Sequence, residues 1–318
     1  MAAGRSHDPT HAHAHGHAHG HTHGRAEDRR RLTVVLALTV AVVVVEVVGA
    51  FVSGSLALLA DAGHMLTDAA GLLVALSASL LAGRPADPRR SYGYHRVEIL
   101  AAALNAVVLL GVCGYLAYAG TRRLLHPAHV DAGPMLTFAL VGLAANLVAI
   151  GVLSAGRDHS LNMKGAYLEV LGDAIGSAAA VVAAVIVLAG GTVRADPIAS
   201  LAIAALVLPR AAALLREAAS VLLESVPADV DLAVVREHLE EVDGVVDVHD
   251  LHAWTITSGM PAMSAHVTVT DAALAARGVG RILDDLTTCV DDCFGIEHAT
   301  FQVEPVSHTA HEHDTQHP

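Results

Sequence analysis

Six long apolar segments, separated by short polar stretches, occupy the first two-thirds of the chain. Each segment is close to the roughly 20 residues that a helix needs to cross a bilayer. We expect the spans at about 32–52, 56–83, 97–120, 133–155, 165–190 and 197–215. The pattern predicts an α-helical membrane protein whose six transmembrane helices form one domain over 32–216.

A different pattern follows from residue 217 to residue 306. Two stretches have the apolar spacing of amphipathic helices, and three have the β-branched character of strands. In chain order they are helix 231–242, strand 245–257, strand 261–270, helix 272–290 and strand 299–306. This αββαβ order predicts a C-terminal cytoplasmic module of the ferredoxin-like α+β type.

Both ends of the chain are rich in histidine. The first 23 residues hold eight His, and from His11 to His23 every second residue is His. Such a tract has no apolar face to bury, so residues 1–31 are expected to be a disordered tail. Because Ala, Gly and Thr interleave with the His, a metal-collecting tail is favoured over an expression tag. A second tail, 307–318, carries four more His and invites the same interpretation.

Composition and charge agree with this division. Of the 318 residues, 53% are apolar and only 16% are charged, which excludes an ordinary soluble domain. Residues 1–216 hold 16 Lys and Arg against 13 Asp and Glu, whereas 217–318 hold 3 against 19. The three Cys are too few for a disulfide framework and fit a reducing compartment for the acidic module.

The placement of positive charge predicts the orientation in the membrane. With the N-terminus inside, the inner flanks carry 12 Lys and Arg, while the outer loops carry only Arg122, Arg123 and Arg194. Because cytoplasmic loops are enriched in Lys and Arg, both termini are expected in the cytoplasm of a multi-pass protein of the cell membrane.

Ionisable residues cluster in two of the spans, where they are costly and therefore suggest function. The second span carries Asp61, His64 and Asp68, and the fifth carries Glu169 and Asp173. A spacing of four places His64 with Asp68, and Glu169 with Asp173, on one helix face each. Facing each other, these groups would form a tetrahedral shell suited to zinc. Hydrogen bonding between helices is the alternative, and it explains five such residues poorly.

Glu46, in the first span, fits two interpretations: a residue of the ion pathway, or a tertiary hydrogen-bonding partner.

Four motifs, in order, resemble those of the cation diffusion facilitators, which are six-span metal-ion/proton antiporters. They are Gly54–Asp68, Tyr92–Leu100, Gly172–Ser177 and Val248–Trp254, within a similarity covering roughly 32–306. The resemblance implies a transport site of His64, Asp68 and Asp173, with position 169 as the fourth ligand. Many zinc-selective members have His there, whereas this chain has Glu169. Zinc is expected as the ion, with cobalt, cadmium and manganese open because ligand type influences selectivity.

The resemblance also implies metal sites in a cytoplasmic dimer interface, and thus a homodimer. By motif match the ligands are His249, His266 and His298, with weaker support for Glu304. Ordinary strand histidines are the alternative for each. Cys289 and Cys293 favour a structural role over metal binding.

The energy source follows from a missing motif. Lys164 is the only lysine and no Gly-Lys dipeptide occurs, so there is no phosphate-binding loop of the ATPase kind. Metal ligands must lose protons to bind, so metal and protons compete. The hypothesis is therefore export of a divalent cation, above all Zn²⁺, in exchange for protons, with His64 as proton carrier. Expected partners are metal ions, protons and lipid, without nucleic acid or enzymatic activity. A membrane-anchored metal sensor or buffer without transport is the alternative.

Overall fold

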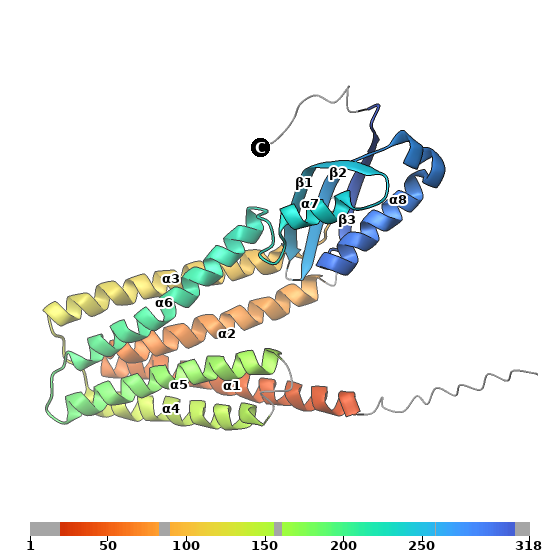
Figure 1. Cartoon of the computed structure of the whole chain (residues 1–318). Coiled ribbons are helices and arrows are strands. Elements are labelled where there is room, and N and C mark those ends of the chain that lie inside the picture. Colours follow the sequence, from red (N-terminus) through yellow and green to blue (C-terminus); the bar gives the residue numbers. More distant parts are fainter. Residues whose placement is uncertain (1–19, 83–89, 156–160, 258, 309–318) are drawn as a thin grey trace, which may run out of the picture. The chain divides into compact units, whose positions relative to one another are not determined.

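The computed structural model describes residues 20–82, 90–155, 161–257 and 259–308, without the side chains of 20–29, 72–82 and 161–162 (Figure 1). The predictions for the His-rich tails at 1–19 and 309–318 lie outside these residues. The chain divides into two compact units, one of residues 1–66 with 116–203 and the other of 67–115 with 204–318. Each unit is described by itself.

The six apolar segments are six long helices, as predicted. They are α1 (Gly20–Ser53), α2 (Leu56–Ala82), α3 (Arg96–Leu125), α4 (Ala132–Ser154), α5 (Leu161–Leu188) and α6 (Ala195–Leu222). Over the residues searched, five of them are long and apolar enough to cross a membrane. The sixth, α2, is 27 residues long and completes the set.

Two helices extend further than the apolar pattern predicts. The first begins at Gly20, so residues 20–31 are helical and not part of a disordered tail as expected. Ala, Glu and Arg at 25–31 are strong helix formers, which lets the helix run beyond its apolar segment. The last, α6, reaches Leu222 instead of about 215 and continues through Pro209.

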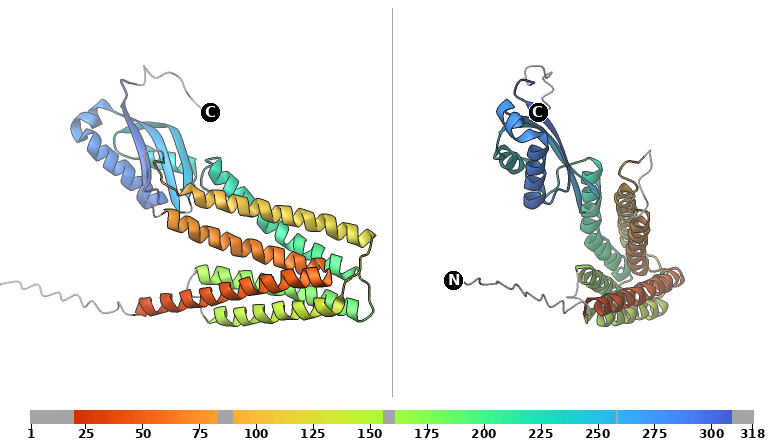
Figure 2. Two further views of the ribbon diagram at one scale, coloured as in Figure 1. Left: turned by 180° about the vertical axis from the view of Figure 1, so that it is seen from behind. Right: turned by 90° about the vertical axis from the view of Figure 1, so that its right-hand side faces the viewer.

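Small side chains let the helices of the first unit approach closely. In this unit α4 packs against both α1 and α5, and Figure 2 shows the three side by side. Their buried contact residues include Ala139, Ala180, Ala183 and Ala184. Alanine at such interfaces brings helix backbones together, which is how helices without bulky core residues gain van der Waals contact in a membrane.

The buried carboxylate of Asp196 holds the start of α2. It accepts hydrogen bonds from the Leu56 and Ala57 backbone N–H groups at 2.9 and 3.0 Å and from Ser55 Oγ at 2.5 Å. Arg123 Nη1 lies 3.6 Å from the same carboxylate. Asp196 thereby satisfies the free N–H groups of a helix N-terminus and forms an ion pair with the half-buried Arg123.

The second unit contains the predicted αββαβ module. Helix α7 (Leu232–Glu240) precedes strands β1 (Val245–Thr257) and β2 (Met260–Val269), and α8 (Asp271–Phe294) leads to β3 (His298–Pro305). The strand order is β1-β2-β3, with β1 and β2 antiparallel and β2 and β3 parallel. The fold-class prediction is confirmed.

Alternation along β2 separates the two faces of the sheet. Met263, Ala265, Val267 and Val269 are buried in one core with residues of α7 and α8, both of which pack on this face (Figure 1). The intervening His266 therefore lies on the opposite face, since successive strand side chains alternate.

The module is connected to the start of α3 within the same unit. Thr257 Oγ1 donates a hydrogen bond to Glu98 Oε2 at 3.0 Å, and Arg96 Nη2 pairs with Glu224 Oε1 at 2.7 Å. Both contacts join residues far apart in sequence, so they link the strand end and the α6 terminus to one helix.

Candidate functional site

His64 and Asp173 are close together inside the first unit. His64 Nε2 of α2 lies 3.8 Å from Asp173 Oδ1 of α5, and the two residues are 8% and 2% exposed. Burying a carboxylate is costly unless a partner or a metal compensates it. An imidazole nitrogen and a carboxylate oxygen at this separation could bind one zinc ion, whose bonds to such ligands are about 2.0–2.2 Å long.

Asp68 follows His64 by one turn on the same continuous helix. Helix geometry holds it on the face that bears His64. His64 and Asp173 belong to one of two groups of possible metal ligands within the searched residues. Inside the second unit, Asp68 Oδ2 also lies 3.9 Å from Arg210 Nη1. The chain therefore supplies its own cation to a carboxylate expected to bind metal.

Glu169 is the predicted ligand that this group does not include. It is half-buried, one turn before Asp173 on α5, and it makes interactions of its own. Its assignment as the fourth ligand stays a prediction.

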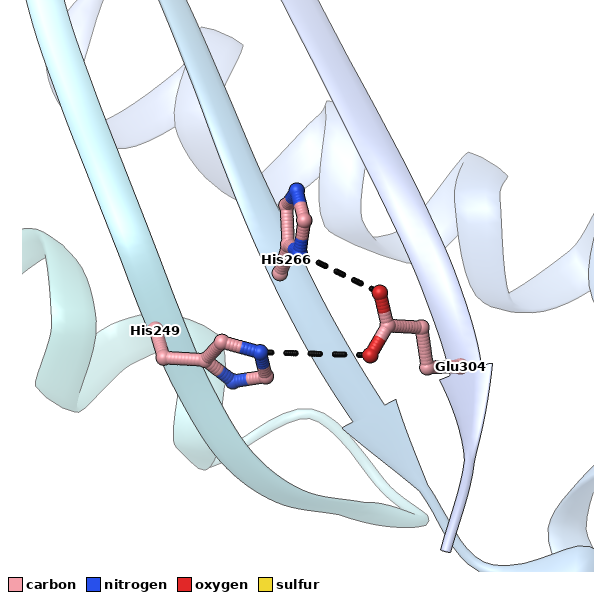
Figure 3. Close-up of side chains that lie close together, drawn as sticks. All are labelled: His249, His266 and Glu304. Carbon is pink, nitrogen blue, oxygen red and sulfur yellow. Dashed lines mark ion pairs between the residues drawn. The ribbon is translucent and has the colours of Figure 1, made fainter. Parts of the chain in front are cut away.

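The second group lies on the sheet face opposite α7 and α8. It consists of His249, His266 and Glu304, one from each strand, with ligand atoms within 4.8 Å of one another (Figure 3). His249 and His266 are register partners across β1 and β2. Glu304 Oε1 lies 3.1 Å from His266 Nδ1, and its Oε2 lies 3.9 Å from His249 Nε2. The folded sheet therefore unites three residues that are distant in sequence.

This donor set fits a zinc ion. Two imidazoles and a carboxylate are usual zinc ligands, and a fourth position remains for water or another ligand. Glu304 is only 2% exposed, and its Oε2 receives no hydrogen bond from the described donors. A buried carboxylate oxygen in that state is suited to a cation between it and the imidazoles.

His298 is the predicted cytoplasmic ligand that lies apart from this group. It is exposed at the start of β3 and pairs with Ala262, whereas His266 pairs with Gln302. Four strand positions separate the two levels, which corresponds to about 13 Å. The sheet register therefore keeps His298 away from the group, and its role stays a prediction.

Sequence reasoning missed Asp250, which the strand irregularity directs toward the site. Its φ is +49°, in the left-handed region, at a register shift between His249 and His252. Its carboxylate lies 3.1 Å from His252 Nε2 and 3.8 Å from His266 Nε2. Aspartate tolerates this conformation better than most residues. The available signal was a carboxylate between two histidines in His249-Asp250-Leu251-His252.

Neither cysteine of α8 belongs to a group of possible metal ligands among the searched residues. Burial raises the pKa of the Cys289 thiol above its usual range, and the neighbouring Cys293 raises it further. Metals bind the thiolate, so a thiol that keeps its proton is a poor ligand. This agrees with the structural role expected for Cys289.

These features define a class: a helical membrane protein with a group of possible metal ligands among its long helices and an α+β module that carries another such group. Residues 32–223 match the cation efflux transmembrane domain, and residues 227–306 match the cytoplasmic domain of cation efflux proteins. The chain belongs to the cation efflux family, the cation diffusion facilitators.

Relatives with known names cover most of the chain. The metal cation efflux system protein CzcD of Cupriavidus metallidurans is 43% identical over 273 residues, 86% of this chain and 85% of the relative. The cadmium, cobalt and zinc/H(+)-K(+) antiporter of Bacillus subtilis is 38% identical over 85% of this chain and 86% of its own. The zinc transporter ZitB of Escherichia coli is 39% identical over 86% and 87%.

A solved structure resembles the cytoplasmic part of the chain. It is the metal-bound C-terminal domain of the CzcD transporter from Cupriavidus metallidurans, 36% identical in sequence. The match covers 24% of this chain and 99% of that chain, with a TM-score of 0.22.

Proposed function

We propose that this protein exports a divalent metal cation, Zn²⁺ above all, from the cytoplasm in exchange for protons. The observation that carries the proposal is the buried His64–Asp173 pair, 3.8 Å apart on two helices of the membrane domain. Asp68, on the same helix face as His64, supplies one further oxygen ligand. Glu169, one turn before Asp173, supplies the other. The named relatives from Bacillus and Escherichia, an antiporter and a zinc transporter, support the same activity.

Competition between metal and protons provides the coupling. Zinc requires a neutral imidazole and ionised carboxylates, so each metal that binds displaces protons from His64 and its carboxylate neighbours. If the site opens alternately to the two sides, protons entering from outside release the metal there. The same groups then return to the cytoplasmic side with protons bound, and His64 is the proposed carrier because imidazole changes charge near neutral pH.

The cytoplasmic module senses the exported ion in this proposal. Zinc held by His249, His266 and Glu304 neutralises part of an acidic domain and so favours pairing of two protomers. The proposed boundaries are 1–31 and 307–318 for the His-rich tails, 32–216 for transport and 217–306 for metal binding and dimerisation. Both termini are proposed to lie in the cytoplasm, with the protein in the cell membrane.

The test is a flux measurement on the full chain in proteoliposomes that contain a metal dye and a pH dye. Zinc, cobalt, cadmium and manganese are compared with and without a pH gradient. Wild type is expected to move zinc into the vesicles while protons leave, so the internal pH rises as internal zinc rises. Asp173→Asn keeps the side-chain shape and removes the charge, so it is expected to abolish both signals.

Asp131→Asn is the matched control. Asp131 is exposed at the start of α4 and its side chain makes no capping hydrogen bond there, so this variant is expected to behave as wild type. Zinc binding without flux under any gradient would reject transport and leave the sensor or buffer, which the cytoplasmic group alone could support. Glu169→His reports whether that residue sets selectivity among the four metals.

A further inference from the structure

A second polar cluster is buried in the first unit and is separate from the metal ligands. It comprises Glu46 of α1, Asp61 of α2, Asn146 of α4 and Ser177 of α5, each at most 1% exposed. Ser177 Oγ is the centre: it lies 2.7 Å from Asp61 Oδ2, 3.4 Å from Glu46 Oε1 and 3.1 Å from Asn146 Nδ2. Four helices thus contribute one polar side chain each to a single buried site.

The two carboxyl groups of this cluster need one hydrogen more than Ser177 and Asn146 supply. A hydroxyl has one hydrogen and two acceptor positions. The one hydrogen of Ser177 serves Asp61 at 2.7 Å or Glu46 at 3.4 Å, but not both carboxyl groups at once. The two carboxyl groups also interact directly. Glu46 Oε2 and Asp61 Oδ1 receive no hydrogen bond from any donor that the structure describes. Two interacting carboxyl groups that each keep an oxygen without a donor are satisfied by one proton shared between them.

The surrounding charges require the same proton. The carboxyl group of Glu46 interacts with the carboxyl groups of Asp61 and Asp173. Glu46 is the only ionisable residue of α1 beyond Arg31, and α4 has none. His64 follows Asp61 by three residues on α2, and its Nε2 lies 3.8 Å from Asp173 Oδ1. Like-charged carboxylates in such surroundings do not both ionise.

Glycines make room for the two carboxyl groups. A Cβ at Gly142 of α4 would overlap Glu46 Oε1, and a Cβ at Gly176 of α5 would overlap Asp61 Oδ1. The cluster is therefore not a chance pairing at a loose contact, because both facing helices lack a side chain where a carboxyl group sits.

We propose that Glu46 and Asp61 share a bound proton and form a counter-ion site distinct from the metal ligands. The inference rests on the proposed exchange of metal for protons and specifies where one proton is carried. A divalent ion at His64 and Asp173 brings positive charge next to the pair, and the shared proton then leaves to the aqueous phase. When the metal departs, the pair takes up one proton again, so charge in the site is balanced in both states.

The test compares two fluxes in proteoliposomes of the full chain. Exchange of labelled zinc for unlabelled zinc needs no net proton movement, whereas uphill zinc transport under a pH gradient does. Glu46→Gln mimics the protonated acid permanently. It is expected to keep zinc exchange and to release about one proton fewer per zinc. With a gradient of about one pH unit, losing one coupled proton lowers the attainable zinc accumulation about tenfold, since both correspond to the same free energy.

Glu217→Gln, the same substitution at an exposed position of α6, is the control and is expected to match wild type. Asp61→Asn is expected to act like Glu46→Gln. An unchanged proton-to-zinc ratio in both variants overturns the proposal. So does a ratio that depends on potassium or sodium but not on pH, which would assign the site to an alkali cation.

A measurement on wild type covers the case in which neither variant assembles. Infrared spectra of the zinc-free protein in lipid at neutral pH are expected to show a protonated carboxyl band that zinc removes. Absence of such a band overturns the shared proton. If wild-type protein moves no zinc at all, the proposed function fails, and the infrared band still decides whether the pair holds a proton.

Discussion

Removing the Glu304 charge should separate zinc binding in the cytoplasmic module from its folding. The only tryptophan, Trp254, lies on β1, so tryptophan fluorescence follows unfolding of this module in the full chain. Zinc at 100 times its dissociation constant stabilises a folded state by about 2.7 kcal/mol. For a domain the size of residues 227–306, this corresponds to a rise in melting temperature of roughly 10–20 °C.

Glu304→Gln keeps the side-chain shape and removes one of three ligands. If zinc affinity falls about 100-fold, the same zinc concentration stabilises by only about 0.4 kcal/mol, or about 2–3 °C. The zinc-induced shift is compared, not the melting temperature itself, because the substitution also changes the metal-free protein. Glu297→Gln, at an exposed position just before β3, should keep the full shift. An undiminished zinc shift in Glu304→Gln would refute the assignment of this group as a zinc site.

Two further outcomes test local packing and reactivity. On α4, Gly151→Ala meets open space and should stabilise the protein by about 0.5–1 kcal/mol through helix propensity. Gly142→Ala crowds the Glu46 carboxyl group and should be about 1–3 kcal/mol less stable than Gly151→Ala in thermal unfolding. Equal stabilities of the two variants would contradict that crowding. On α8, iodoacetamide at about pH 8.5 should label the exposed Cys293 faster than Cys289, as measured by mass spectrometry. The reason is that the raised pKa keeps the Cys289 thiol protonated as pH rises. In the denatured protein the two cysteines should be labelled at the same rate.

Features set by local sequence could be predicted well. Six spans and the αββαβ order follow from apolar periodicity and β-branched runs, which each segment carries by itself. The spacing of four between His64 and Asp68 likewise fixes a common face on any helix, and their role as metal ligands stays a prediction. The start of α1 was missed because helix propensity, not hydrophobicity, extends it back to Gly20.

Features set by long-range contacts could not be predicted from the sequence. Glu304 joins His266 only because β3 runs parallel to β2 in one particular register, and the same register removes His298 from the group. A shift of the β3 register by one residue would have turned the Glu304 side chain to the opposite face of the sheet. The contact between Ser177 and Asn146 could not be predicted, although Ser177 ends the Gly172–Ser177 motif, since a buried serine and asparagine are ordinary in membrane helices until their partners are known.

The same two helices carry both buried sites of the membrane domain, and this constrains how metal and protons are coupled. On α2, Asp61 precedes His64 by three residues, and on α5, Ser177 follows Asp173 by four. Each helix therefore presents one of the proposed metal ligands, His64 or Asp173, and one member of the buried polar cluster about a turn apart. Any displacement of α2 relative to α5 that draws His64 and Asp173 around a metal also changes the 2.7 Å contact between Ser177 and Asp61. Because a packed helix moves as a unit, the two sites do not adjust independently. Coupling through a rigid pair of helices needs no chain of intervening residues, and it explains why a counter-ion site can lie beside the metal ligands without sharing any of them.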